Sequence, residues 1–254
     1  MLERIDINCD MGESFGAYKL GRDAEVMEYI SSANIACGWH GGDPMVMDYT
    51  VRLAKEKGVA VGAHPGYPDL LGFGRRRMDL SLPEIENYVL YQIGALYAFT
   101  KAQGIPLQHV KAHGALGNLA FADLEASKAF ARAVLRFSRE LILVVYTGTI
   151  MVRAAEEVGV RFVEEVYADR AYNPDGTLQS RKIPGSVIHD PDRAARQAMT
   201  MAQEGYVVAH DGTQFKVNPE SLCVHGDTPT AVAILQKIRE RLKKASITVR
   251  PMGA

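Results

Sequence analysis

The sequence predicts an α/β fold in which parallel strands alternate with helices, and it favours a closed TIM-like (β/α) barrel. The 254 residues fit one large domain, and single-domain α/β barrels reach this length. Short apolar runs alternate with longer helix-period segments along the chain, and no Pro-, Gly- or Ser-rich linker divides it. Capping residues mark the helix ends, which supports the alternation independently of hydrophobicity.

Seven segments have the length and apolar character of strands. They are residues 4–10, 33–37, 59–63, 109–112, 141–145, 162–166 and 222–225. Periodicity does not separate an open doubly wound sheet from a barrel, but seven strand–helix units favour the barrel. We therefore predict a single barrel domain over residues 1–254.

The helices between these strands carry start and stop signals. Asp43 before a proline predicts the start of a helix that Gly58 ends. Ser81 and Glu84 form a capping box for a long helix that ends at Gly104. Two later helices are predicted, one between Asp190-Pro191 and Gly205, and one opening at Thr228-Pro229 with a buried stripe at Ile234, Leu235, Ile238 and Leu242.

Two stretches are long enough to leave the barrel as loops. Residues 65–80 are rich in Gly and Arg, and residues 168–186 contain the turn sequence Asn-Pro-Asp-Gly. Gly212 and its flanking residues predict a small hairpin. Long loops in compact domains are often functional lids, although flexible surface insertions are the ordinary alternative.

The composition excludes several classes of protein. Lys plus Arg is 29 and Asp plus Glu is 30, a net charge of −1, which disfavours a dedicated nucleic-acid binder. The longest clean apolar run, residues 141–146, is far below the ~20 residues of a membrane span, and no signal-peptide core is present. We expect a cytoplasmic protein without a membrane partner. The three cysteines lack C-x-x-C spacing and are expected to be buried thiols.

Ionisable residues follow six of the seven predicted strands, at the edge where the carboxyl ends of parallel strands meet. A lone histidine beside a strand is more often structural than catalytic. Four histidines, however, stand at matching places beside Gly or Pro, which favours one shared active site. The candidates are Asn8, Asp10, Glu13, His40, His64, Lys111, His113, Asp169, Arg170, His225 and Asp227.

Strand alternation puts Asp6, Asn8 and Asp10 on one face, which in a closed barrel is its interior. Buried carboxylates need compensation, and Lys111 and Arg170 are the expected partners. Such pairs lower the pKa of the acids and prepare a pocket for an anionic substrate, although a purely structural salt-bridge network would explain the same charges.

A divalent metal and a phosphate are both conceivable ligands. The candidate metal ligands are Asp10, His40, His64 and His113, because carboxylate and imidazole groups suit zinc, manganese or iron. The sequence has no H-E-x-x-H pair, the short helical motif that binds zinc in metalloproteases. The sequence has neither a P-loop nor G-x-G-x-x-G, and no G-x-S-x-G elbow supports a serine nucleophile. The Gly-Phe-Gly-Arg-Arg-Arg segment at 72–77 could hold a phosphate or form an exposed basic loop.

Six ordered blocks give the chain a family resemblance over nearly its whole length. They are NCDMGESFG (8–16), ANIACGWH (33–40), GAHPGYPD (62–69), KAHGAL (111–116), EVYADR (165–170) and CVHGD (223–227). On these residues the chain resembles the LamB/YcsF family. The family's fold is similar to the irregular seven-stranded barrels of the glycoside hydrolase/deacetylase superfamily.

The resemblance also implies a function. It points to the A subunit of bacterial 5-oxoprolinase, in which the lactam 5-oxo-L-proline (pyroglutamate) is hydrolysed to L-glutamate, ADP and phosphate, with ATP as cosubstrate and subunits B and C as partners. Phosphorylation of the lactam oxygen would create a leaving group for attack by water. Which of the three chains binds ATP stays open.

On this hypothesis Asp10 or Asp227 activates water, and His113 or His225 carries the proton. Lys111 and Arg170 hold the substrate carboxylate or the phosphoryl charge. Glu13 and Asp169 complete the catalytic set, while Asn8, His40 and His64 are assigned to substrate binding.

Two other functions remain open. One is a metal-dependent amide or N-acetyl-sugar hydrolase that acts without ATP, suggested by the imidazole cluster. The other is a noncatalytic subunit that binds a lactam or carboxylate for its partners.

Overall fold

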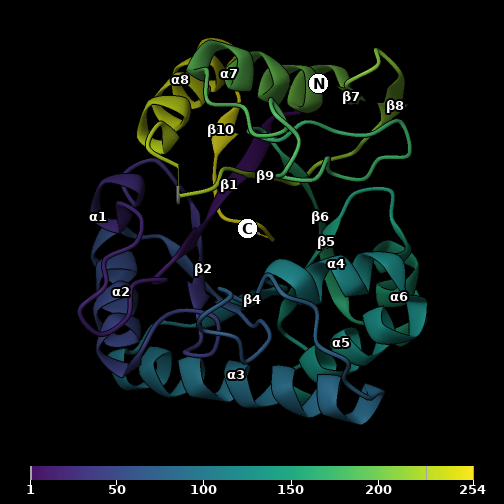
Figure 1. The fold of residues 1–254 in the computed structure, drawn as a ribbon. Coiled ribbons are helices and arrows are strands. Elements are labelled where there is room, and N and C mark those ends of the chain that lie inside the picture. Colours follow the sequence, from purple (N-terminus) through teal and green to yellow (C-terminus); the bar gives the residue numbers. More distant parts are fainter. Residues whose placement is uncertain (1, 227, 254) are drawn as a thin grey trace.

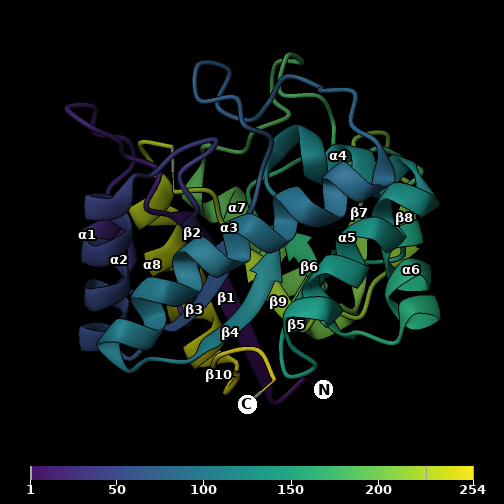
Figure 2. The same cartoon turned by 90° about the horizontal axis from the view of Figure 1, so that it is seen from below.

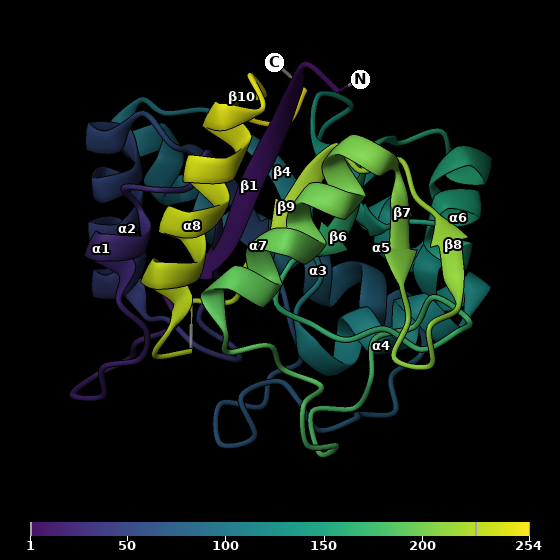
Figure 3. The ribbon, with the colours of Figure 1, turned by 90° about the horizontal axis from the view of Figure 1, so that it is seen from above.

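Seven parallel strands close into a barrel in the computed structural model, which describes residues 2–226 and 228–253. The last barrel strand, β9, pairs with both β6 and β1 and thereby closes the circle (Figure 3). The barrel strands are β1 (Arg4–Met11), β2 (Ser32–Ala36), β3 (Ala60–His64), β4 (Leu107–Lys111), β5 (Ile142–Tyr146), β6 (Arg161–Tyr167) and β9 (Ser221–Cys223). The predicted barrel is confirmed, and every predicted strand boundary lies within two residues of the observed one.

Three short strands of the described part of the chain lie outside the barrel circle. β7 (Tyr206–Val208) and β8 (Gln214–Lys216) form an antiparallel hairpin, whose turn contains Gly212 at φ +91°. This is the hairpin predicted from Gly212. β10 (Thr248–Val249) pairs in parallel with the first residues of β1.

Helices surround the barrel (Figure 1). They are α1 (Asp23–Val26), α2 (Pro44–Lys57), α3 (Leu82–Gln103), α4 (Gly114–Ala122), α5 (Leu124–Phe137), α6 (Ile150–Val158), α7 (Pro191–Met199), the π-helical turn η1 (Thr200–Glu204) and α8 (Ala231–Lys244). Among the described residues, no helix has both the length and the apolar character needed to cross a membrane.

The predicted capping signals form as expected, with one exception. Ser81 and Glu84 make the capping box of α3, and Gly104 ends that helix at φ +67°. The start of the last helix was predicted wrongly. Thr228 and Pro229 precede α8 in a turn, in which the carbonyl of Thr228 accepts a hydrogen bond from the N–H of Ala231, the first helical residue.

Asp43 provides a test of the capping energetics. Its side chain accepts hydrogen bonds from the backbone N–H groups of Met45 and Val46 at the start of α2, and from Gly16 in the preceding loop. We expect Asp43→Ala to lower the free energy of unfolding by about 0.5–2 kcal/mol, because these N–H groups lose their acceptor. Urea denaturation measures the change, and Asp43→Asn is the control that retains an acceptor. Equal stability of Asp43→Ala and wild type would contradict the prediction.

The first strand places polar side chains inside the barrel, as its alternation predicts. Asp6 is 1% exposed and accepts hydrogen bonds from Ser31, Ser32 and Ser221. Burial raises the pKa of Asp6 from 3.8 to about 6, and the three hydroxyl donors only partly offset that effect. The acid therefore binds its proton more tightly in the folded state than in the unfolded state.

This pKa shift predicts a pH dependence of stability. The contribution of Asp6 is fully present below pH ~4 and is lost as pH rises through about 6, because unfolding then releases the proton. We expect the free energy of unfolding of wild type, minus that of Asp6→Asn, to fall by about 2–3 kcal/mol between pH 4 and 7. Denaturant titrations over this range measure it. A difference that stays constant with pH would contradict the raised pKa.

The two long loops lie at the end of the barrel toward which the strands point, and Figure 2 shows them above the barrel. Arg170 forms an isolated β-bridge with Val187, and Tyr172 forms one with Leu178, so the second loop is folded back on itself. The loops thus stand over the carboxyl ends of the strands.

Candidate active site

A cavity of about 610 Å³ opens at the carboxyl ends of the barrel strands. Four barrel strands or the residues just after them contribute Asp10, His64, Lys111 and His225 to its wall. The two long loops add basic side chains from above. Further polar side chains of the lining are those of His113, Tyr146, Tyr167, Arg75, Arg170, Arg181 and Lys182.

Asp10, Lys111 and Glu165 form a charged cluster beside the cavity. The Lys111 ammonium lies 2.8 Å from Glu165 Oε1 and 3.3 Å from Asp10 Oδ1, and the lysine side chain is 2% exposed. Burial would raise the pKa of Asp10, but His64 and Lys111 together lower it well below its usual range. Burial would lower the pKa of Lys111. The attraction of nearby groups, with Asp10 the strongest, instead raises this pKa well above its usual value. Asp10 and Lys111 are therefore both charged at neutral pH.

Two asparagine side chains fix the geometry of this cluster. Asn8 donates to Glu165 Oε1 at 2.8 Å, and its oxygen accepts from Lys111 at 3.2 Å and from Asn34 at 2.8 Å. Asn34 also donates to Asp10 Oδ1 at 2.9 Å. The carboxylate of Asp10 thus has a fixed orientation as well as a partner of opposite charge.

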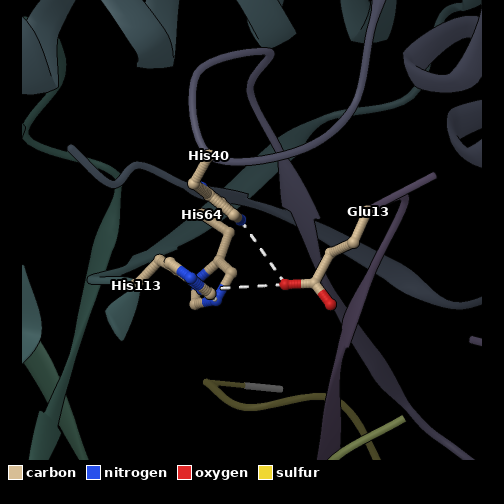
Figure 4. Close-up of side chains that lie close together, drawn as sticks. All are labelled: Glu13, His40, His64 and His113. Carbon is tan, nitrogen blue, oxygen red and sulfur yellow. Dashed lines mark hydrogen bonds and ion pairs between the residues drawn. The ribbon is translucent and has the colours of Figure 1, made fainter. Parts of the chain in front are cut away.

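Three imidazoles lie together on one side of the cavity (Figure 4). His64 Nδ1 donates to the backbone carbonyl of Lys111 at 2.8 Å, and His113 Nε2 donates to that of Phe73 at 2.8 Å. The other nitrogens of these two rings, His64 Nε2 and His113 Nδ1, face each other at 3.0 Å. His40 stacks on His113 with a centroid separation of 3.6 Å.

The environment of His113 and His40 favours neutral imidazole. Burial and then the neighbouring His64 lower the pKa of His113 to about 3. Burial, followed by the adjacent imidazoles, lowers the pKa of His40 well below its usual value. His113 is consequently a poor proton carrier near neutral pH.

A second acid–imidazole pair lies on another side of the cavity. Asp169 accepts hydrogen bonds from the backbone N–H of His225 at 2.9 Å and from its Nδ1 at 3.0 Å. Burial opposes ionisation of Asp169, but His225 lowers its pKa below the usual range. His225 also stacks on Tyr167. The carboxylate fixes the tautomer of the ring and leaves Nε2 as the nitrogen that can act on a ligand.

Arg170 does not pair with the barrel acids as predicted. Its guanidinium donates to the backbone carbonyls of Gln179 and Ser186, within the loop that follows β6. Among the described residues it therefore supports the loop over the cavity, and of the two predicted cations only Lys111 compensates Asp10.

The arginines of the predicted phosphate-binding segment at 72–77 do not all face the cavity. Arg75 lines the cavity and lies over the ring of Phe73, 4.9 Å from its centroid. Arg76 forms an ion pair with Asp69 instead. Together with Arg181 from the other loop, Arg75 gives the mouth of the cavity a basic character.

The structure brings most of the predicted site residues together. Asp10, His64, Lys111, His113, Arg170 and His225 line the cavity. Four other predicted residues lie directly behind the lining, where each contacts a lining residue. They are Asn8, Glu13, His40 and Asp169. Asp227 lies outside the described residues.

Sequence reasoning missed Glu165 and Asn34 as parts of the site. Both occupy interior positions of their strands: Glu165 is two residues before Tyr167 on β6, and Asn34 pairs in register with Asp10. A polar residue at an inward position of a buried strand is the signal that would have identified them.

A polar cavity at the carboxyl ends of parallel barrel strands is the arrangement that barrel enzymes share. The chain belongs to the LamB/YcsF family, whose model matches residues 5–254. It is 56% identical over 250 residues to the 5-oxoprolinase A subunit of Thermococcus onnurineus (strain NA1), with 98% of each chain covered. The corresponding A subunit of Pyrococcus furiosus is 53% identical over 250 residues, again with 98% coverage of each. A crystal structure described as the lactam utilization protein from Thermus thermophilus has a TM-score of 0.92 at 50% identity, covering 97% of this chain and 99% of that one.

Proposed function

We propose that this protein acts on 5-oxo-L-proline as the A subunit of a 5-oxoprolinase, opening the lactam ring to give L-glutamate with ATP as cosubstrate and subunits B and C as partners. Its relatives carry that name over nearly their full length, and a similar solved structure is described as a lactam utilization protein. The word subunit implies an assembly of several chains.

The observation that carries the proposal is the convergence of two acid–base pairs on one basic cavity. The Asp10–Lys111 pair and the Asp169–His225 pair meet a lining that also contains Arg75. A small lactam with a carboxylate, and any phosphorylated form of it, is an anion that such a cavity attracts.

The chemistry requires cleavage of the ring C–N bond. Attack of the lactam oxygen on the γ-phosphorus of ATP releases ADP and leaves an activated, O-phosphorylated carbon. Water then adds to that carbon. Loss of phosphate at this stage would only regenerate the lactam, so the ring nitrogen has to leave with a proton, giving an acyl phosphate. A second water releases phosphate and completes L-glutamate.

His225 suits the proton transfer better than His113. Asp169 fixes its Nδ1–H, so Nε2 can take a proton from the attacking water and deliver it to the departing ring nitrogen. Asp10, with its lowered pKa, orients the water by accepting a hydrogen bond rather than by taking the proton. Lys111 and Arg75 stabilise the negative charge that develops.

The test is release of glutamate from 5-oxoproline, assayed with the chain alone and with purified subunits B and C, each with and without ATP. The proposal expects turnover only when ATP and all three subunits are present. Turnover by the chain alone without ATP would instead support a metal-dependent hydrolase. Calorimetric binding of 5-oxoproline, with unchanged turnover after His225→Gln and Asp10→Asn in the complex, would support a noncatalytic binding subunit.

A further inference from the structure

Four potential metal ligands lie at the ends of four neighbouring barrel strands. Glu13 follows β1, His40 follows β2, His64 ends β3 and His113 follows β4. One ligand atom of each lies within 4.8 Å of all the others, and all four residues are buried. Figure 4 shows Glu13 facing the imidazoles of His40 and His113 across a short gap.

The hydrogen bonds of His64 and His113 leave one nitrogen of each ring facing the other ring. Each ring uses one nitrogen as a donor to a backbone carbonyl, of Lys111 and of Phe73 respectively. The opposite nitrogens, His64 Nε2 and His113 Nδ1, lie 3.0 Å apart, and neither is used in a hydrogen bond to a backbone carbonyl. One cation placed against both nitrogens would bind the two rings without breaking either carbonyl hydrogen bond.

His40 gives an independent indication of a missing partner. Its side chain is completely buried, yet among the described residues neither ring nitrogen has a hydrogen-bond partner. Its Nε2 lies 3.4 Å from Glu13 Oε1. A buried polar group without a hydrogen bond is costly, and a metal ion bound to Nε2 would remove that cost for this nitrogen.

Two glycines bring the loop after β3 close to these rings. A Cβ atom on Gly66 would lie 2.9 Å from His40 Nδ1, and one on Gly74 would lie 2.7 Å from His40 Cβ and 2.8 Å from His113 Cδ2. A larger residue at either position would displace the imidazoles. The loop therefore holds the rings in place around Glu13.

We propose that Glu13, His40, His64 and His113 bind one divalent transition-metal ion of the zinc type. Three of the ligand separations, 3.0, 3.4 and 3.6 Å, are close to the ~3.3 Å between ligands in a tetrahedral site with bonds of about 2.0–2.1 Å. Binding of one ion by both would require the stacked rings of His40 and His113 to tilt toward it. Glu13, rather than Asp10, provides the carboxylate, because Asp10 is already held by Lys111 and Asn34.

The ion lies behind the wall that His64 and His113 present to the cavity. There it fixes both rings and adds positive charge close to Asp10, which lies 3.3 Å from His64 Nε2. The carbonyl hydrogen bonds from His64 and His113 are the outer contacts that orient metal-bound imidazoles in other proteins.

Metal binding is tested on untagged protein that has been treated with a chelator and dialysed. Zinc titration by calorimetry is expected to give one ion per chain, and Co²⁺ is expected to produce the visible absorption bands of a tetrahedral site. Glu13→Gln and His40→Gln are each expected to weaken zinc binding at least about tenfold. His225→Gln, which removes a cavity histidine outside the cluster, is the matched control and retains the affinity.

Absence of stoichiometric zinc and cobalt binding by the wild-type chain overturns the proposal, and this result needs no variant to fold. Wild-type affinity in folded Glu13→Gln and His40→Gln also overturns it. The assay uses neither 5-oxoproline, ATP nor partner chains. Its failure is therefore distinguishable from failure of the proposed lactam chemistry.

Discussion

Replacing Lys111 with methionine is expected to lower the free energy of unfolding by about 3–5 kcal/mol. The ammonium lies between Glu165 and Asp10 at 2.8 and 3.3 Å in a site where the lysine is 2% exposed. Its removal leaves two neighbouring carboxylates with much less compensation, and the side chain of Glu165 is completely buried. Urea denaturation at neutral pH measures the loss.

Two further variants make this result specific. Lys182→Met removes an exposed lysine from the lining of the same cavity and is expected to change stability by no more than about 0.5 kcal/mol. Adding Glu165→Gln to Lys111→Met removes one of the uncompensated charges and is expected to recover part of the loss. Equal effects of the Lys111 and Lys182 substitutions would show that the buried ion pairs do not determine stability here.

Replacing His225 with glutamine is expected to lower turnover of 5-oxoproline by the three-subunit complex about 10²–10⁴-fold. Glutamine fills a similar volume but cannot accept and return a proton at neutral pH. Asp169→Asn is expected to cause a comparable loss, because the ring then loses the carboxylate that fixes its tautomer. ATP-dependent glutamate release measures both variants.

The control for this pair is His189→Gln, which changes an exposed histidine outside the cavity lining and is expected to leave turnover unchanged. Circular dichroism and assembly with the partner chains show whether each variant is folded. Normal turnover in a folded His225→Gln complex would rule out His225 as the proton carrier.

The parts of the fold that depend on local sequence were predictable. The capping residues at Asp43 and Ser81 act within a few residues of themselves, and strand ends follow from short apolar runs. The grouping of Asp10, His64, Lys111 and His225 was also predictable, because the ends of parallel strands meet whatever the loops do.

The partners of individual side chains were not predictable in the same way. Asn8 donates to Glu165, 157 residues away, and that contact depends on barrel closure and on which face of β6 points inward. Arg170 was assigned to the acids from its position after a strand, yet the loop it belongs to provides nearer acceptors. Contacts within a folded loop are set by its conformation, which the turn signals alone do not specify.

Closure of the barrel by β9 has a consequence during synthesis on the ribosome. One edge of β1 can pair with β2 early in synthesis, but the other edge can pair with β9 only after Ser221–Cys223 have been synthesised. The hydrogen bond from Ser221 to Asp6 likewise joins residues 215 positions apart. Until then the nascent chain carries an open strand edge and a carboxylate without one of its three hydroxyl donors. Such edges attract other chains, so we expect partially synthesised forms of this protein to depend on chaperones more than the finished barrel does.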